Sequence, residues 1–583
     1  MEHFARFLSA LLRKQEPSAG PALDDAVLAL TSGLEEGHVC LDIESDEKVR
    51  NAIPALRKMQ TIVGGPGDYK PLILDGNRLY LARYWHYEQI VESAFRKLTS
   101  SASPHVDPRS LRDTLKRLFP EGLDGNEQAF ATLGAAVRNL AIISGGPGTG
   151  KTTTVSRILA LKLMLRPPGS PYVIKLAAPT GKAADRLRDA ISHAKAALDI
   201  PEADRQLIPE DASTVHRLLG MRQGSGRPAR NADDPLHADL LVLDEASMID
   251  LSLMARIADA LRPGAGLVLL GDRDQLDAVQ PGSVFGELCG DHGYSASFLS
   301  LAGEVLSTRR PQTEHEGGLC DSLFILNKSY RFKEDQGIGR LARAVNAGDE
   351  DEAIRVLRTD TSGELRWNEH LERTSDYFPE KAVAAWLRPF FEIVRTRAGE
   401  TKCFDAFAQF RLLTPLREGR GSVQALNDRV EQWLRQERLV AGEAKWYPGR
   451  PVMIAENNYT LNLFNGDVGI TMDSGEGSPM VAFPDEGETF RNFPPARLPG
   501  HALAYATTVH KSQGSEFDEV ILLIPEVDSP VITRNLLYTG ITRAKKRCTI
   551  WGTEAMIRAG IRRKPRRMSG LGERLTKELG KEM

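Results

Sequence analysis

The run Leu140-Ala-Ile-Ile-Ser-Gly145-Gly-Pro-Gly-Thr-Gly-Lys151-Thr152 decides the fold of the surrounding chain. The apolar stretch Leu140–Ser144 is typical of a buried strand, and a helical pattern follows the glycines over Thr153–Leu165. Glycines let backbone N–H groups turn inward around an anion, and the N-terminus of the next helix adds its dipole. A chance glycine loop is the alternative, but the strand before it and the helix after it favour a phosphate-binding P-loop.

The P-loop predicts a site for ATP and Mg²⁺. Lys151 carries the positive charge for the β- and γ-phosphates, and the hydroxyl of Thr152 is a magnesium ligand. The expected nucleotide contacts are the loop residues and the first helical turn: Gly145, Gly146, Pro147, Gly148, Thr149, Gly150, Lys151, Thr152 and Thr153.

Two later strands supply the other groups that hydrolysis needs. The strand Leu240–Leu243 ends in Asp244 and Glu245. Asp244 is expected to hold Mg²⁺, and Glu245 to orient and deprotonate the attacking water. Alone, such an acidic strand end is often only solvated. A further strand, Leu267–Leu270, is followed by Gln275, which is placed to sense the γ-phosphate; an ordinary polar loop is the alternative.

Composition limits the class of protein. A chain of 583 residues is too long for one core, so we expect roughly three to five domains. The net charge of −3 means that any nucleic-acid contact must come from a local groove. The five cysteines are far apart, which predicts reduced thiols rather than a metal site. No apolar stretch is long enough for a membrane span, and the N-terminus is typical of an amphipathic helix rather than a signal peptide.

Short apolar runs alternate with helical patterns along most of the chain, which is typical of parallel sheets covered by helices, and one segment interrupts this alternation. Between Trp446 and Leu498 the pattern changes to short strands with turns, which indicates a small all-β insertion. The chain ends in the basic stretch 562–567, which is either a solvated tail or a contact for DNA or a partner.

Seven further blocks resemble the superfamily 1 helicases, and within them the RecD subunits of the bacterial exonuclease V (RecBCD) complex. The blocks are Ala178-Pro-Thr-Gly-Lys182-Ala-Ala, Ser213-Thr-Val-His216-Arg-Leu-Leu, Asp244-Glu-Ala-Ser247, Gly271-Asp-Arg-Asp-Gln275, Ser329-Tyr-Arg331-Phe, Thr508-Val-His-Lys-Ser-Gln-Gly-Ser-Glu516-Phe and Tyr538-Thr-Gly-Ile-Thr-Arg543-Ala-Lys545. They stand in the family's order. With Gln128 and the P-loop they cover about Gln128 to Lys545, and the finer likeness rests on Phe464-Asn-Gly-Asp467 and Gly37-His-Val-Cys-Leu41.

The resemblance implies an α/β protein with two RecA-like P-loop NTPase domains, an N-terminal docking domain and a small SH3-like β-barrel insertion. The expected boundaries are 1–110 for partner docking, 111–328 for the first RecA-like domain, 329–445 with 499–560 for the second, 446–498 for the insertion and 561–583 for a basic tail. The glycine-rich stretch near 219–238 resembles the family's strand-separating pin; a floppy loop is the alternative.

The resemblance also implies roles for residues remote from the P-loop. Arg331 and Arg543 are expected to reach the γ-phosphate as arginine fingers, although either alone could be a surface ion pair. Gln128 matches the position that reads adenine, and Glu516 the ribose contact. The expected DNA contacts are Thr180, Lys182, Thr214, His216, Thr508 and His510. For the two histidines a capping or core role is an equal alternative.

The implied activity is ATP-driven 5′-to-3′ movement on single-stranded DNA, or from a DNA duplex end, in the cytoplasm. The implied partners are RecB-like and RecC-like subunits, and the resemblance places the complex in recombinational repair of double-strand breaks. The sequence shows no cluster of carboxylates suited to a nuclease, so we assign that activity to a partner. The alternatives are a free-standing or relaxase-type helicase and, from another class, an ATP-dependent DNA-binding switch that does not move.

Overall fold

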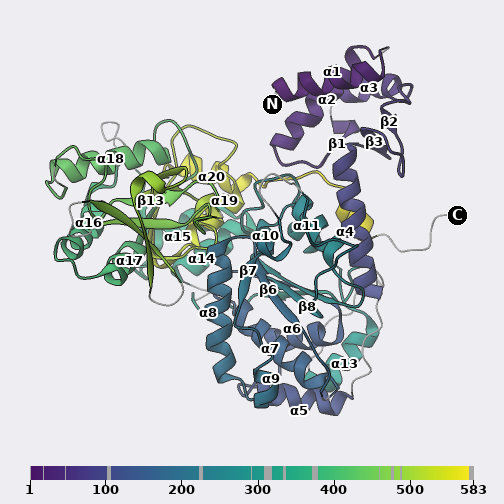
Figure 1. Ribbon diagram of the computed structural model, residues 1–583, viewed down its shortest axis with the longest axis horizontal. Helices are drawn as coiled ribbons and strands as arrows, with labels where there is room; N and C mark the ends of the chain where they lie inside the picture. Colours follow the sequence, from purple (N-terminus) through teal and green to yellow (C-terminus); the bar gives the residue numbers. More distant parts are fainter. Residues whose placement is uncertain are drawn as a thin grey trace.

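The chain folds around two parallel sheets, with a smaller β body beside one of them and an N-terminal body beside the other (Figure 1). In this computed structural model the described chain excludes residues 1, 18, 46, 101–106, 168, 222–226, 291, 308–317, 333–335, 370–377, 441, 459, 474–477, 486–488 and 577–583.

The first parallel sheet has the strand order β10-β5-β9-β8-β6-β7, and with its helices we call it the first lobe. Its strands are β5 Leu140–Gly145, β6 Ile174–Ala178, β7 Ala212–Thr214, β8 Leu240–Leu243, β9 Gly266–Gly271 and β10 Leu323–Leu326. Its helices are α5 Pro108–Leu118, α6 Glu127–Val137, α7 Lys151–Leu165, α8 Gly181–Ala197, α9 Glu202–Arg205, α10 Val215–Leu218, α11 Leu251–Ala260, α12 Val284–Leu288 and α13 Ala296–Leu306. Every residue of β5, β8 and β9 is buried, because helices cover both faces of the sheet.

The second parallel sheet has the order β11-β20-β19-β12-β18 and, with its helices, forms the second lobe. Its strands are β11 Leu365–Asn368, β12 Phe410–Thr414, β18 Ala506–Thr508, β19 Phe517–Leu523 and β20 Ala544–Trp551. Its helices are α14 Gly337–Ala347, α15 Glu350–Thr359, α16 Glu380–Arg395, α17 Glu400–Ala408, α18 Val423–Gln436, α19 Arg534–Ile541 and α20 Glu554–Arg562. Two separate apolar cores fill its two faces, so both lobes are three-layered α/β units.

An antiparallel sheet of order β16-β15-β14-β13-β17 interrupts the second lobe. Its strands are β13 Pro451–Ile454, β14 Val468–Asp473, β15 Pro479–Pro484, β16 Phe490–Phe493 and β17 His501–Leu503. β17 lies beyond the expected end of this body at residue 498, because it pairs with β13, with Leu503 opposite Val452. A small core of its own includes Ile454 and Phe483.

The N-terminal body joins helices to a four-stranded sheet. Its elements are α1 Glu2–Gln15, α2 Pro21–Glu35, β1 Cys40–Asp42, α3 Glu47–Leu56, β2 Val63–Gly64, β3 Leu72–Asp75, β4 Arg78–Leu81 and α4 Ala82–Ser100. The predicted amphipathic helix is confirmed as α1, which buries Leu12 and exposes Phe7. The long helix α4 runs from this body along the first lobe and packs on α11 (Figure 1).

The chain after the basic stretch packs on the N-terminal body, whereas Arg562, Lys564 and Arg566 of the stretch itself stay exposed. After α20 the chain returns to the N-terminal body, where α21 Leu571–Thr576 buries Leu571 and Leu575 one turn apart. Backbone hydrogen bonds fix the approach: the N–H of Val39 donates to the carbonyl of Met568 at 2.8 Å. The two leucines and the ion pair of Arg574 with Asp75 hold this segment against the N-terminal body. Residues 577–583 of the expected tail lie outside the described residues.

All five cysteines are free thiols, and four of them are buried. Among the described residues no helix combines the length and apolar character needed to cross a bilayer. The same part of the chain brings no three metal-binding side chains of His, Cys, Asp or Glu type together.

Candidate active site

The P-loop lies at the carboxyl end of β5, between that strand and α7. Gly148 and Gly150 both have φ of 79°, a left-handed conformation that favours glycine. A Cβ atom on Gly148 would come within 2.4 Å of the Cβ of Arg331, so the loop passes too close to the second half of the chain for a side chain. The Nζ of Lys151 donates to the carbonyls of Gly145 at 2.5 Å and Gly146 at 3.2 Å. The ammonium is thus held at the mouth of the loop.

The acidic pair follows β8, the strand next but one to β5 in the sheet. Glu245 has φ of 50°, an uncommon conformation for a non-glycine residue that often marks functional sites. Its backbone N–H donates to Asp244 Oδ1 at 2.8 Å. Burial, and then the neighbouring Glu245 carboxylate, raises the pKa of Asp244 to about 6. Because burial and a like charge disfavour the ionised form of Asp244, a cation beside it would stabilise that form.

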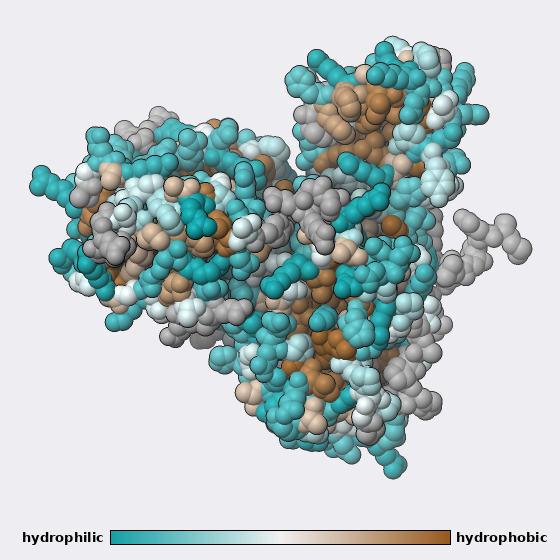
Figure 2. Space-filling model, in the orientation of Figure 1, coloured by the Kyte–Doolittle hydropathy of each residue, from teal (hydrophilic) through white to brown (hydrophobic). Residues whose placement is uncertain are grey.

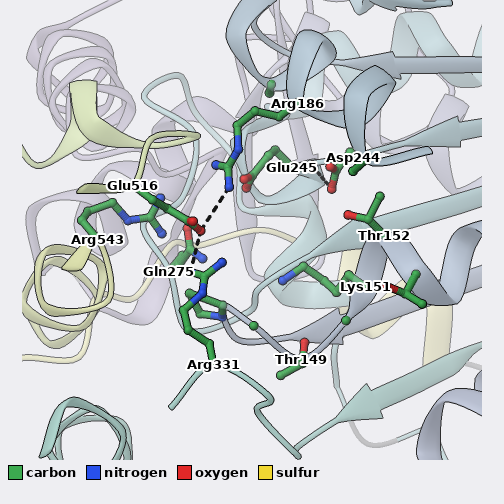
Figure 3. A pocket seen from close by; sticks show the side chains of 16 residues that line it. Thr149, Lys151, Thr152, Arg186, Asp244, Glu245, Gln275, Arg331, Glu516 and Arg543 are labelled. Carbon is green, nitrogen blue, oxygen red and sulfur yellow. Dashed lines mark hydrogen bonds and ion pairs between the residues drawn. The ribbon is translucent and has the colours of Figure 1, made fainter. Parts of the chain in front are cut away.

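A cavity of about 240 Å³ joins these groups to residues from the second half of the chain. Its lining includes, besides Pro147–Thr153, Ala183, Arg186, Ala190, Asp244, Glu245, Gln275, Arg331, Glu516 and Arg543. In Figure 3 the Lys151 ammonium faces Arg331 and Gln275, with Thr152, Asp244 and Glu245 along one side. The structure therefore brings together the P-loop, the acidic pair and both expected arginines, across the junction between the lobes.

Glu516 pairs with two of the arginines that line the cavity. Its carboxylate accepts from Arg331 Nη1 at 2.7 Å and pairs with Arg186 Nη2 at 3.1 Å. Burial alone would raise the pKa of Glu516, but Arg186 and Arg331 outweigh it and lower the pKa to about 2. The negative charge of Glu516 thus lies between the guanidinium groups of Arg331 and Arg186, where the phosphates of a nucleotide would also be attracted.

Arg543 is almost completely buried, with 2% of its surface exposed. Its Nε donates to the carbonyl of Thr539 and its Nη1 to the carbonyl of Ser515, both at 3.2 Å. Burial lowers the pKa of the guanidinium, and the carboxylates of Glu245 and Glu516 oppose that shift. A buried guanidinium beside the nucleotide cavity is suited to stabilising charge that develops on a transferred phosphoryl group.

Gln275 and Gln128 are both buried, and their side-chain amides are already engaged. Gln275 Nε2 donates to Asp272 Oδ2 at 2.9 Å. Gln128 Nε2 donates to the carbonyl of Thr149 at 3.0 Å, and its Oε1 accepts from Arg157. Gln128 therefore braces the back of the P-loop in this structure and is not among the residues that line the cavity.

The expected DNA contacts lie at the carboxyl ends of strands in both lobes. The hydroxyls of Thr180, Thr214 and Thr508 each accept a backbone N–H at the start of the next helical turn, so all three act as caps. Lys182 is exposed in the first turn of α8, and Thr508 is buried.

His216 and His510 are partly buried, and burial lowers the pKa of each imidazole. At neutral pH both rings are therefore uncharged, which suits a hydrogen-bonding contact better than an ionic one.

The middle of the expected pin, residues 222–226, lies outside the described residues. Its two arms meet at the base, where the N–H groups of Ala229 and Arg230 donate to the carbonyl of Leu219. Neither arm contains a strand within the residues described between 219 and 238.

Sequence reasoning missed Arg186 and Tyr538. Arg186 lies on α8 of the first lobe, and its Nη1 also donates to the carbonyl of Gly514 at 2.9 Å. Tyr538 lies on α19 and donates to Asp272 Oδ2 at 3.0 Å. Both stood inside or beside recognised blocks, but only the fold shows that their partners belong to the opposite lobe.

Comparison with known proteins gives matches along most of the chain. Residues 128–281 match the family described as the AAA domain, and residues 503–551 match the UvrD-like helicase C-terminal domain. The chain is 36% identical over 589 residues to the RecBCD enzyme subunit RecD of Mycobacterium tuberculosis (strain CDC 1551 / Oshkosh), which covers 98% of this chain and 94% of that protein. It is 28% identical over 504 residues to the ATP-dependent RecD2 DNA helicase of Deinococcus radiodurans, covering 85% of this chain and 58% of that protein.

Among solved structures, the Pif1 helicase from Candida albicans aligns with a TM-score of 0.35 and 16% identity. The alignment covers 74% of this chain and 96% of that one.

Proposed function

This chain belongs to the RecD family of RecBCD enzyme subunits, and on that premise we propose that its two lobes form an ATP-driven motor on single-stranded DNA. It is an ATP-dependent DNA helicase subunit of a RecBCD-type enzyme. The observation that carries the proposal is the cavity in which Lys151 and Glu245 of the first lobe meet Arg331 and Arg543 from the second half of the chain.

The residues of the cavity fit Mg·ATP. The proposed metal ligands are the Thr152 hydroxyl and the Asp244 carboxylate, both oxygen donors of the kind that Mg²⁺ prefers. The metal, when bound, neutralises charge on the phosphates. We assign Lys151 to the β- and γ-phosphates, Glu245 to orienting the attacking water, and Gln275 to sensing the γ-phosphate.

Stepping follows from the position of the cavity. A triphosphate that pairs with Lys151 on one side and Arg331 and Arg543 on the other draws the lobes together, and hydrolysis removes that bridge. We propose that DNA crosses both lobes at the carboxyl ends of their strands, with Thr180, Lys182, Thr214 and His216 on the first lobe and Thr508 and His510 on the second. We propose that the two lobes are RecA-like domains and that the β insertion flanks the DNA path.

We propose that the N-terminal body docks the RecC-like subunit of a cytoplasmic complex that also holds a RecB-like subunit. The support is an apolar surface on α1 and α2, where Phe7 is 64% exposed and Leu28 47% exposed. Apolar side chains gather on this body in Figure 2. Phe7→Glu with Leu28→Glu should abolish co-purification of the partners while leaving the ATPase activity of the chain unchanged.

The motor is tested on DNA with one defined overhang, using the complex purified from its native cell. We expect unwinding from a 5′ overhang to require this chain, so Lys151→Gln should abolish it while the chain stays folded and in the complex. The matched control is Lys175→Gln, an exposed lysine on β6 of the same lobe. Equal 5′-overhang unwinding by the Lys151→Gln complex contradicts the proposal.

A free-standing helicase stays as the second candidate because of the Deinococcus radiodurans relative. It predicts unwinding by the isolated chain and no co-purifying subunits.

A further inference from the structure

The loop that carries Gln275 is hydrogen-bonded to the opposite lobe. Asn535 Nδ2 donates to the carbonyl of Gln275 at 3.0 Å, and the N–H of Leu276 donates to Thr539 Oγ1 at 3.0 Å. Gln513 Nε2 donates to the carbonyl of Leu276 at 2.8 Å. The loop begins at the end of β9 in the first lobe, yet these three bonds tie its far end to the second lobe.

A fourth bond reaches the side chain of the glutamine itself. Tyr538 OH donates to Asp272 Oδ2 at 3.0 Å, and the same oxygen accepts from Gln275 Nε2 at 2.9 Å. The other oxygen of Asp272 accepts from the N–H of Asp274 at 3.1 Å. The Asp272 carboxylate therefore links the Tyr538 hydroxyl to the Gln275 amide. Both of its oxygens accept hydrogen bonds, which fixes its orientation.

All three groups are shielded from water. Tyr538 is 5% exposed, Gln275 4% and Asp272 2%. Burial and the adjacent Asp272 raise the pKa of Tyr538 well above its usual range, so its hydroxyl keeps the proton that it donates. A buried charge-assisted hydrogen bond of this kind is strong and directional.

The helix that presents Tyr538 also sets the position of Arg543. Arg543 lies two residues beyond the end of α19, and its Nε donates to the carbonyl of Thr539, the residue after Tyr538. A Cβ atom on Gly146 would lie 2.8 Å from Tyr538 OH, so the hydroxyl also lies against the P-loop. A shift of α19 therefore moves Arg543 and Tyr538 together.

We propose that Tyr538 is a positioning residue for ATP hydrolysis, which aligns Gln275 through Asp272 as Arg543 enters the site. This inference rests on the proposed motor function. Alignment of the glutamine then depends on the second lobe being in place, so an open cleft holds ATP without hydrolysing it. Asn535 and Thr539 share the task by fixing the backbone of the same loop.

The test is Tyr538→Phe, which keeps the buried ring and removes only the hydroxyl. Single-stranded-DNA-stimulated ATPase activity should fall about tenfold in kcat, while KM for ATP changes by less than about twofold. The matched control is Tyr505→Phe. Tyr505 is a fully buried tyrosine of the same lobe, and its hydroxyl bonds only Tyr447 OH, at 3.1 Å, among the described contacts. Unchanged kcat in Tyr538→Phe, with an active wild type, overturns the inference.

A double-mutant cycle separates positioning from a general structural role. If Tyr538 acts through Gln275, then adding Tyr538→Phe to Gln275→Ala should lower kcat no further. Multiplied losses in the double variant overturn the inference, since they show that the tyrosine acts by another route. The proposed function fails separately, when the wild-type chain itself shows no DNA-stimulated ATPase activity.

Discussion

Replacement of Glu516 by glutamine should make the cleft bind a bare triphosphate more tightly. Glu516 pairs with Arg331 and Arg186, and burial opposed by these arginines leaves its pKa at about 2, against 4.5 for the free side chain. At about 1.4 kcal/mol for each pH unit, the shift corresponds to a net preference of about 3 kcal/mol for the charged carboxylate, which is its attraction to the arginines less the cost of burial. A triphosphate must compete with that attraction, and the glutamine variant removes it.

The gain in affinity is smaller than the full attraction. The Arg186 side chain is 43% exposed, so solvent screens part of its pairing. We therefore expect magnesium tripolyphosphate to bind Glu516→Gln about tenfold more tightly than wild type, equivalent to about 1.4 kcal/mol. The depressed pKa means that the ion pair is present above the ordinary pKa of glutamate and is lost only as pH falls toward 2. The difference in tripolyphosphate affinity between Glu516→Gln and wild type should accordingly stay constant across near-neutral buffers.

Isothermal titration calorimetry at low ionic strength measures this difference. The control is Glu519→Gln, which removes the same charge from a carboxylate that pairs with Arg547 and does not line the cavity. A parallel titration with MgATP tests the ribose contact, because loss of that contact should make the gain for ATP smaller than for tripolyphosphate. Equal or weaker tripolyphosphate binding by Glu516→Gln would refute the assignment of Glu516 as a stand-in anion.

Three further predictions concern stability and the C-terminal segment. Burial, followed by the nearby Glu88 carboxylate, raises the pKa of Glu287 to about 8, and Glu287 accepts from the N–H of Gly572. Because burial and Glu88 favour the neutral form, the stability of the packing around Glu287 should be complete below the ordinary pKa of glutamate and be lost as pH rises through about 8. The protection factors of residues 568–576, which are exchange rates corrected for base-catalysed chemical exchange, should therefore fall between about pH 6 and about pH 8.5. Glu287→Gln should flatten that pH profile; a profile identical to wild type contradicts the assignment. Gly134→Ala should lower the apparent melting temperature, because its Cβ would lie 1.9 Å from the Phe324 ring in the core, a cost of about 1–3 kcal/mol. By contrast, Gly303→Ala, a helical glycine with nothing within 4 Å of the added Cβ, should leave the melting temperature unchanged or raise it, and equal melting of the two variants would contradict both.

Much of the sheet architecture was predictable because short apolar runs in parallel sheets are buried along their whole length. Leu240–Leu243 is a strand with the predicted bounds, and Leu267–Leu270 lies within β9. The P-loop was predictable since each of its residues has a local physical task. Strand order and the return of the chain at α21 were not, because they depend on pairings far apart in sequence.

The site was predictable only as a set of residues, not as a set of contacts. The blocks identified Arg331, Glu516 and Arg543 as neighbours of a nucleotide, and the structure brings all three to one cavity. No local pattern reveals that Glu516 pairs with Arg186 of α8, or that Tyr538 reaches Asp272. Such contacts form between lobes, where spacing along the chain carries no information.

Closure of the cleft by nucleotide is the central claim, and single-molecule fluorescence energy transfer measures it most directly. Dyes would be attached to cysteines replacing the exposed Ala197 on α8 and Thr401 on α17, with the partly exposed native Cys320 changed to serine. Addition of Mg²⁺ with a non-hydrolysable ATP analogue should bring the dyes closer together, and Arg543→Ala should lose that response. Identical transfer efficiency with and without saturating nucleotide in the unmodified site would contradict the account.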